Sequence, residues 1–357
     1  MKSIAESIRR LSPAYFALVM ATGIIGIAFH QIGFRGLSIA FMWLNVVQYI
    51  ILWILTLWRI IRFPREFGAD LIGHQSGPGF FTTVAGTCIL GSQSILIGHA
   101  HFFAFFLWGF GIALWVALTY FIFATFTIKE NKPSLDQGIS GAWLLAVVAT
   151  QAIAVLSALL ASRLAQPHRL HVNFLALSMW LWGGMMYIWM ISLIFYRYAF
   201  FRFSPNDLSP PYWINMGAMA ISTLAGARLI ENAADAWFLE SLRPFIKGFT
   251  IFYWATGTWW IPMLFILAIW RHVYKRFPLI YDPLYWGAVF PLGMYTVSTL
   301  EMDRSMRLDF MYVLPRVFIY IAMGAWMLTF WGMLMSIFRH FLAKKSPINA
   351  SGPPGPR

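Results

Sequence analysis

A short segment recurs along the chain, and each copy opens a long apolar run. In the first copy, Pro13 is followed at +2 and +3 by the aromatic residues Tyr15 and Phe16. Related openings begin at Pro78, Ser140, Pro210 and Pro283. The Ser140 copy is the weakest, because it lacks the proline and keeps only Trp143 at +3. A second apolar run without this opening follows each copy. The repeat therefore predicts five two-helix hairpins.

The composition places these hairpins in a lipid bilayer. Hydrophobic residues make up 60% of the chain and charged residues 11%, with a mean hydropathy of +0.68. A soluble domain could not cover its surface with so few polar groups. Apolar runs of about 20 residues match the roughly 30 Å hydrocarbon core as helices, whereas barrel strands would be shorter and alternating. The sequence predicts an all-α membrane protein.

The basic residues indicate orientation rather than binding to nucleic acid. The 26 Lys and Arg outnumber the 13 Asp and Glu, and they gather in short clusters beside apolar runs, such as Arg59, Arg62 and Arg65. Most of them fall in segments on the same side as the N-terminus. By the positive-inside rule, both termini are expected in the cytoplasm and the chain in the plasma (inner) membrane. Membrane lipid is an expected partner of the chain, and nucleic acid is not.

Ten membrane spans are predicted between a cytoplasmic N-terminal segment, residues 1–11, and a disordered cytoplasmic tail, residues 341–357. Together they form one transmembrane domain, residues 12–340. The expected spans are residues 12–31, 38–58, 79–98, 102–127, 139–161, 172–196, 211–230, 246–270, 284–300 and 314–338.

Odd and even spans differ in composition. Odd spans carry small and hydroxylated residues in their middles, such as Ala21-Thr22-Gly23, whereas even spans are bulkier, such as Phe102 to Trp108. Bulky apolar side chains suit lipid, and small ones suit the interior. The simplest arrangement is a pseudo-fivefold ring, with the odd helices lining a central pore. The alternative is that the small residues only allow close helix packing, with no conduit.

Several motifs resemble a known family. They are Pro13 to Gly23 (PAYFALVMATG), Trp254 to Pro262 (WATGTWWIP) and Phe290 to Tyr295 (FPLGMY). Together with ten spans in five hairpins, they resemble the tellurite-resistance and dicarboxylate transporter family. That family includes the slow-type anion channels of plant guard cells, bacterial tellurite-resistance channel homologues, and fungal malate and sulfite transporters. The resemblance covers about residues 10–340.

The resemblance implies a homotrimer in which each protomer has its own pore, closed near mid-membrane by a phenylalanine beside a helix-kinking proline. Phe290 and Pro291 match these positions. The long cytoplasmic termini that carry regulatory phosphorylation in plant members are missing from this sequence, so the resemblance does not extend to kinase control.

The repeat itself predicts a pore-lining layer. Counting seven residues from each start gives Met20, Ala85, Val147, Gly217 and Phe290. Phe290 is the only large aromatic side chain among them, so a hydrophobic constriction would form there. The alternative is an ordinary packing role for Phe290. Further candidates for the pore lining are the small or polar residues of the odd spans: Thr22, Thr87, Thr150, Gln151 and Gly293.

Charged residues lie at the ends of the odd spans, opposite the N-terminus. Arg228 and Arg304 are candidates for attracting anions at a pore mouth, and the alternative is that they form salt-bridged helix caps. His168 and His171 lack nearby carboxylate or cysteine partners, so no metal site is predicted, and no cofactor is expected.

The leading functional hypothesis is passive passage of small anions, because no charge is evident at mid-membrane to couple an ion gradient. The alternatives are a C4-dicarboxylate (malate-type) carrier, with or without coupling to protons, and sulfite or tellurite-related efflux. An enzyme is not expected, because catalytic motifs such as HExxH and GxSxG are missing from the sequence. The sequence does not identify the permeant anion.

Overall fold

The computed structural model describes residues 2–343, and every regular element among them is helical. The helix α13 continues to Ala343, so it includes the first residues of the predicted tail. The rest of that tail, residues 344–357, lies outside the described residues.

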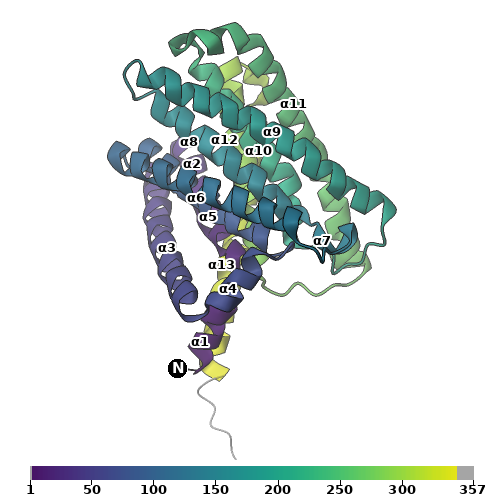
Figure 1. Cartoon of the computed structure of the whole chain (residues 1–357). Coiled ribbons are helices and arrows are strands. Elements are labelled where there is room, and N and C mark those ends of the chain that lie inside the picture. Colours follow the sequence, from purple (N-terminus) through teal and green to yellow (C-terminus); the bar gives the residue numbers. More distant parts are fainter. Residues whose placement is uncertain (1, 344–357) are drawn as a thin grey trace, which may run out of the picture.

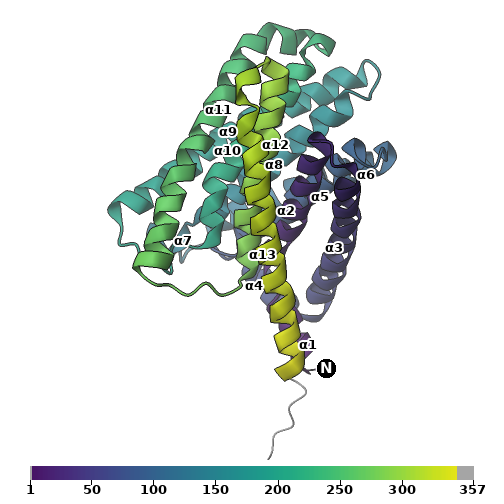
Figure 2. The same ribbon diagram turned by 180° about the vertical axis from the view of Figure 1, so that it is seen from behind.

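Ten long helices form five consecutive antiparallel pairs (Figures 1 and 2). The pairs are α2 (Ala17–Gln31) with α3 (Arg35–Arg62), α5 (Phe81–Leu96) with α6 (His101–Ile128), α8 (Leu145–Ala161) with α9 (His168–Phe200), α10 (Ile214–Glu231) with α11 (Trp237–Ile269), and α12 (Trp286–Met306) with α13 (Val313–Ala343). The two helices of each pair pack against each other. Three shorter helices are α1 (Lys2–Arg9), α4 (Pro64–Leu71) and α7 (Leu135–Gly138).

A 3₁₀ turn opens the first helix of every pair, at the positions where the sequence repeats. The turns are Pro13–Phe16, Gly77–Phe80, Gly141–Leu144, Pro210–Trp213 and Pro283–Tyr285. Proline suits such a start, because its φ is already helical and its missing N–H would have no partner there.

The third copy begins one residue later than predicted. The Ser140 hydroxyl accepts a hydrogen bond from the backbone N–H of Ala142, just as the Ser12 hydroxyl accepts one from Ala14. Ser140 is therefore the capping residue before the turn. The residue equivalent to Pro13 is Gly141, and positions counted from Ser140 must be moved by one.

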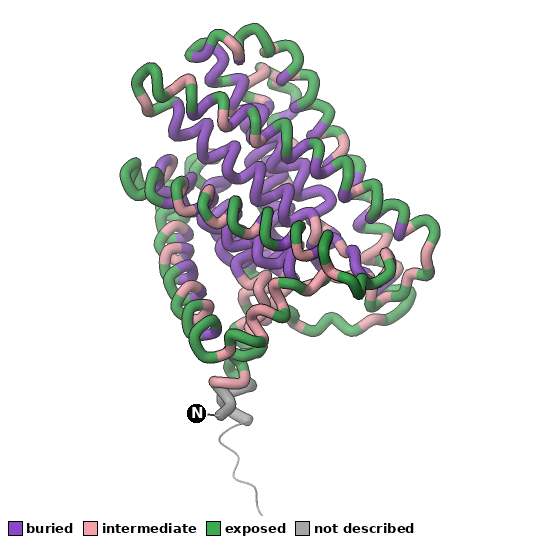
Figure 3. The backbone as a smooth tube through the Cα atoms, viewed as in Figure 1, coloured by how far each residue is buried: buried purple, intermediate pink, exposed green. Residues whose placement is uncertain are grey.

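Burial separates the two helices of each pair (Figure 3). In the apolar windows of α2, α5 and α8 between 83% and 100% of residues are buried, against 17% to 44% in α3, α6, α9, α11 and α13. In α10 every residue is buried except Arg228 and Glu231. The first helices of the pairs thus form the interior, and the second helices cover them. Below they are called inner and outer helices.

The inner helices contact one another in a closed cycle. Helix α2 packs against α5, α5 against α8, α8 against α10, α10 against α12, and α12 against α2. The N-terminal helix α1 and the C-terminal end of α13 lie at the same end of the molecule (Figures 1 and 2).

Within the described residues, eight helices are long and apolar enough to cross a membrane. The two other expected spans, 211–230 and 284–300, correspond to α10 and α12. Both helices carry charges near their C-terminal ends, Arg228 and Glu231 in α10 and Glu301 in α12. Because neighbouring helices surround them, their side chains need not be apolar enough to face lipid.

Candidate functional site

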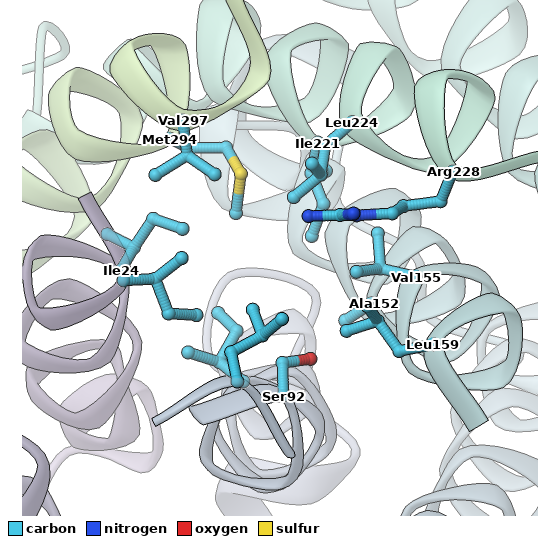
Figure 4. Close-up of a pocket in the computed structure, with 13 residues that line it drawn as sticks. Ile24, Ser92, Ala152, Val155, Leu159, Ile221, Leu224, Arg228, Met294 and Val297 are labelled. Carbon is cyan, nitrogen blue, oxygen red and sulfur yellow. The ribbon is translucent and has the colours of Figure 1, made fainter. Parts of the chain in front are cut away.

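A narrow cavity lies between the C-terminal halves of the inner helices, and all five contribute to its wall (Figure 4). The first lining residue from each helix is Ile24, Ile89, Ala152, Ile221 and Met294. Further lining residues follow at helical spacing, such as Val297 after Met294. The volume of the cavity is about 20 Å³, which is enough for one ordered water molecule.

The wall of this cavity is almost entirely apolar. The hydroxyl of Ser92 is already bonded to the carbonyl oxygen of Cys88, at 2.9 Å. Arg228 is the only charged residue of the lining, and its guanidinium reaches from α10 into the cavity (Figure 4). The cavity therefore has an apolar body and a single cation at one end.

A second, wider cavity lies at the N-terminal ends of the same helices. Its volume is about 330 Å³, and its wall includes residues from all five repeat openings: Ser12, Gly79, Ser140, Ser209 and Leu284. Helix N-termini carry partial positive charge, and the openings of all five inner helices contribute to this wall, together with Arg197 and Asp207.

Arg197 of α9 also lines the wider cavity, although it is buried. Its guanidinium donates to the Tyr212 hydroxyl and, at 3.0 Å, to the Asp207 carboxylate. Partial burial acts to raise the pKa of Asp207. Hydrogen bonds from Ser204 and the charge of Arg197 outweigh burial, so the pKa of Asp207 lies below its usual value.

No residue belongs to both cavities. Along each inner helix the nearest lining residues of the two cavities are ten positions apart, for example Ala14 and Ile24, so more than one layer of side chains lies between them. One turn before the first lining residues, on the same helix faces, are Met20, Ala85, Val148, Gly217 and Phe290. All five are buried, and Phe290 is 0% exposed. By this count Val148 takes the place of the predicted Val147, as the shifted start at Gly141 requires. That this layer lines a pore stays a prediction.

The charged residues at the far end of the narrow cavity form an ion-pair network. Arg228 is 2.7 Å from carboxylate oxygens of both Glu231 and Glu301. Arg304 is exposed, 3.5 Å from Glu301, and donates to the Gln31 carbonyl. Of the two predicted mouth residues, only Arg228 reaches the cavity. Both lie inside helices that extend beyond the predicted spans.

The sequence profile of the voltage-dependent anion channel family matches residues 10–334. The chain belongs to this family. An uncharacterized transporter of Methanocaldococcus jannaschii is 26% identical over 309 residues, which cover 84% of this chain and 85% of the relative. A sulfite efflux pump of Arthroderma benhamiae is 24% identical over 352 residues, covering 91% and 90%. An uncharacterized membrane protein of Mycobacterium tuberculosis is 38% identical over 149 residues, covering 42% and 75%.

In this member of the anion channel family, the predicted polar lining residues face outer helices instead of the cavity. Thr22, Thr87 and Thr150 each bond to an aromatic side chain of an outer helix, and the Gln151 amide donates to the Trp180 carbonyl. None of these four residues lines either cavity. Their hydroxyl and amide groups hold inner and outer helices together.

These bonds follow a rule that sequence reasoning missed. The outer helix of each hairpin bonds through an aromatic side chain to the inner helix of the next hairpin, at 2.8 to 3.1 Å. The pairs are Tyr49–Thr87, Trp115–Thr150, Trp180–Ser222, Trp254–Thr299 and Trp326–Thr22. The recurrence of Trp or Tyr near the middle of the even spans was the available signal.

Two glycines predicted to line the pore lie at tight helix contacts. A Cβ atom on Gly217 would lie 2.7 Å from the Pro291 ring, and one on Gly293 would lie 2.7 Å from Ile24. Glycine at these positions lets α12 approach α10 on one side and α2 on the other. Pro291 is thus packed against the layer that contains Phe290.

Proposed function

We propose that the protein is a passive channel for small anions, with a pore through each protomer. The pore runs along the axis of a pseudo-fivefold ring formed by α2, α5, α8, α10 and α12. The closed cycle of contacts between these helices supports this arrangement, and membership of the voltage-dependent anion channel family supports the anion as the transported species.

The observation that carries this proposal is a pair of cavities along the inner helices, separated by a section that contains one apolar layer at the level of Phe290. In that layer Phe290 is the only aromatic side chain, beside Met20, Ala85, Val148 and Gly217. A constriction of this kind excludes water and so blocks ions without any charge. We assign Phe290 as the gate and Pro291 as the residue that fixes its position against α10.

The apolar wall of the narrow cavity fits a channel better than a carrier. Carriers generally hold their substrate at a polar site near the middle of the membrane. Along this axis the only charged lining residue of the narrow cavity, Arg228, lies at its far end. An anion would be held weakly inside and would leave easily.

Replacement of Phe290 by Ala should raise anion conductance in planar bilayers at least about tenfold, because the wider constriction admits water. Phe81→Ala is the matched control, since Phe81 is also fully buried but stacks on Phe123 of the outer helix α6. Conductance that is unchanged in a correctly folded Phe290→Ala protein contradicts the gate.

A second candidate function is sulfite efflux, because three fungal relatives carry that name. A C4-dicarboxylate carrier is the further alternative. Flux of chloride, nitrate, sulfite and malate into liposomes separates them. Flux that is shared by several anions and needs no pH gradient supports a channel. Saturable malate uptake driven by a pH gradient supports a carrier.

We also propose that three copies associate, each with its own pore, in the plasma (inner) membrane. Residues 12–340 form the membrane domain, with both termini in the cytoplasm. The wide cavity then opens to the cytoplasm and Arg228 lies at the external end. Native mass spectrometry of the detergent-purified protein tests the trimer.

A further inference from the structure

Glu301 is a buried carboxylate at the external end of the axis, with only 3% of its surface exposed. It accepts a hydrogen bond from the Gln31 side chain of α2 and forms an ion pair with Arg228 of α10. Arg304, one turn further along α12, adds a second positive charge at 3.5 Å. The carboxylate thus joins three of the five inner helices at one point.

Arg228 gives this carboxylate a direct connection to the pathway. Its guanidinium extends into the narrow cavity (Figure 4), and its buried Nε has no hydrogen-bond partner. A guanidinium is the preferred group for binding oxyanions and other small anions. An anion that passes along the axis must come close to Arg228, yet the carboxylate of Glu301 already pairs with it.

We propose that Glu301 is a tethered competitor of the permeating anion at Arg228. Its carboxylate occupies the place that a small inorganic anion would take, so that anions bind weakly at the external mouth and move on. This inference rests on the proposed channel function and adds a residue that controls anion affinity there.

A fixed carboxylate has a clear consequence for transport. Arg228 without a counter-charge would bind an anion tightly and slow its release. Glu301 reduces that affinity while keeping the guanidinium in the cavity wall. Glu231 also pairs with Arg228, but its side chain is 35% exposed, so solvent screens its charge more strongly.

The test uses the full chain in planar bilayers, in the Phe290→Ala background, with external chloride and, separately, nitrate. Glu301→Gln keeps the shape of the side chain and removes its charge. The external anion concentration that gives half-maximal current should fall about five- to tenfold, at the lower end of the range for coupled sites. The internal half-maximal concentration should stay unchanged.

Two further variants identify the cause. Arg228→Gln combined with Glu301→Gln should abolish this gain in apparent anion affinity, because the group that binds the anion is gone. Glu301→Asp withdraws the carboxylate by one methylene and should give a smaller gain in apparent anion affinity. It replaces Glu301→Gln in the test if that variant does not fold. Glu240→Gln removes the exposed partner of Arg243 and should change nothing.

An unchanged half-maximal concentration in folded Glu301→Gln and Glu301→Asp overturns the competitor role, even if the Phe290→Ala parent conducts anions. A gain that persists in the double variant overturns Arg228 as the binding group. If the Phe290→Ala parent with native Glu301 conducts no anion, the channel proposal itself has failed, and this inference fails with it.

Discussion

At the scale of single residues, the clearest feature is that the five repeats place different side chains at one level. Gly217 has no side chain at this level, whereas Phe290 presents a full aromatic ring. The repeat made this contrast predictable. The partner of Gly217 was not predictable, because Pro291 follows it by more than seventy positions.

Gly217→Ala should destabilise the protein by about 1–3 kcal/mol, because the added methyl group would overlap the rigid ring of Pro291. Gly109→Ala is the control. A Cβ atom there meets nothing within 4 Å, so this substitution should stabilise the protein by up to about 1 kcal/mol. Thermal unfolding in detergent, followed by circular dichroism, measures both. Equal unfolding midpoints for the two variants would contradict the tight contact.

At the scale of elements, the repeat predicted the five hairpins and the inner position of the first helix in each. The start of the third copy was wrong by one residue, because a capping serine stands before a glycine where the other copies have proline. The role of the hydroxyl groups was missed for a different reason. A threonine inside a helix bonds equally well to water in a pore or to a neighbouring indole, and only the three-dimensional packing decides.

The aromatic bonds between successive hairpins should contribute measurably to stability. Trp115→Phe keeps an aromatic ring but removes the N–H that donates to Thr150. The expected loss is about 0.5–1.5 kcal/mol, as for other hydrogen bonds between membrane helices. Trp43→Phe, at a position 61% exposed on α3, is the control and should have little effect. Equal losses of stability in the two variants would argue against a stabilising role for the Trp115–Thr150 hydrogen bond.

At the scale of the whole molecule, the account has one requirement: water and anions must reach the faces of the inner helices that point to the axis. Two cavities along these helices, and a section between them that contains the apolar layer of Phe290, are the structural basis for this claim. The outer helices expose large apolar side chains such as Phe102 and Leu328, which suit lipid or a neighbouring protomer.

Thiol labelling along α12 tests this claim most directly. Cys88, the sole cysteine, is first replaced by Ala, and Phe290→Ala opens the gate. Met294→Cys then places a thiol in the wall of the narrow cavity, whereas Thr299→Cys places one against Trp254 of α11. Both positions are buried, so exposure at the surface cannot explain a difference. A small anionic thiosulfonate should modify Cys at 294 and block the current, and leave Cys at 299 unmodified. Protection of position 294 together with labelling of the outer helices would contradict an axial pathway.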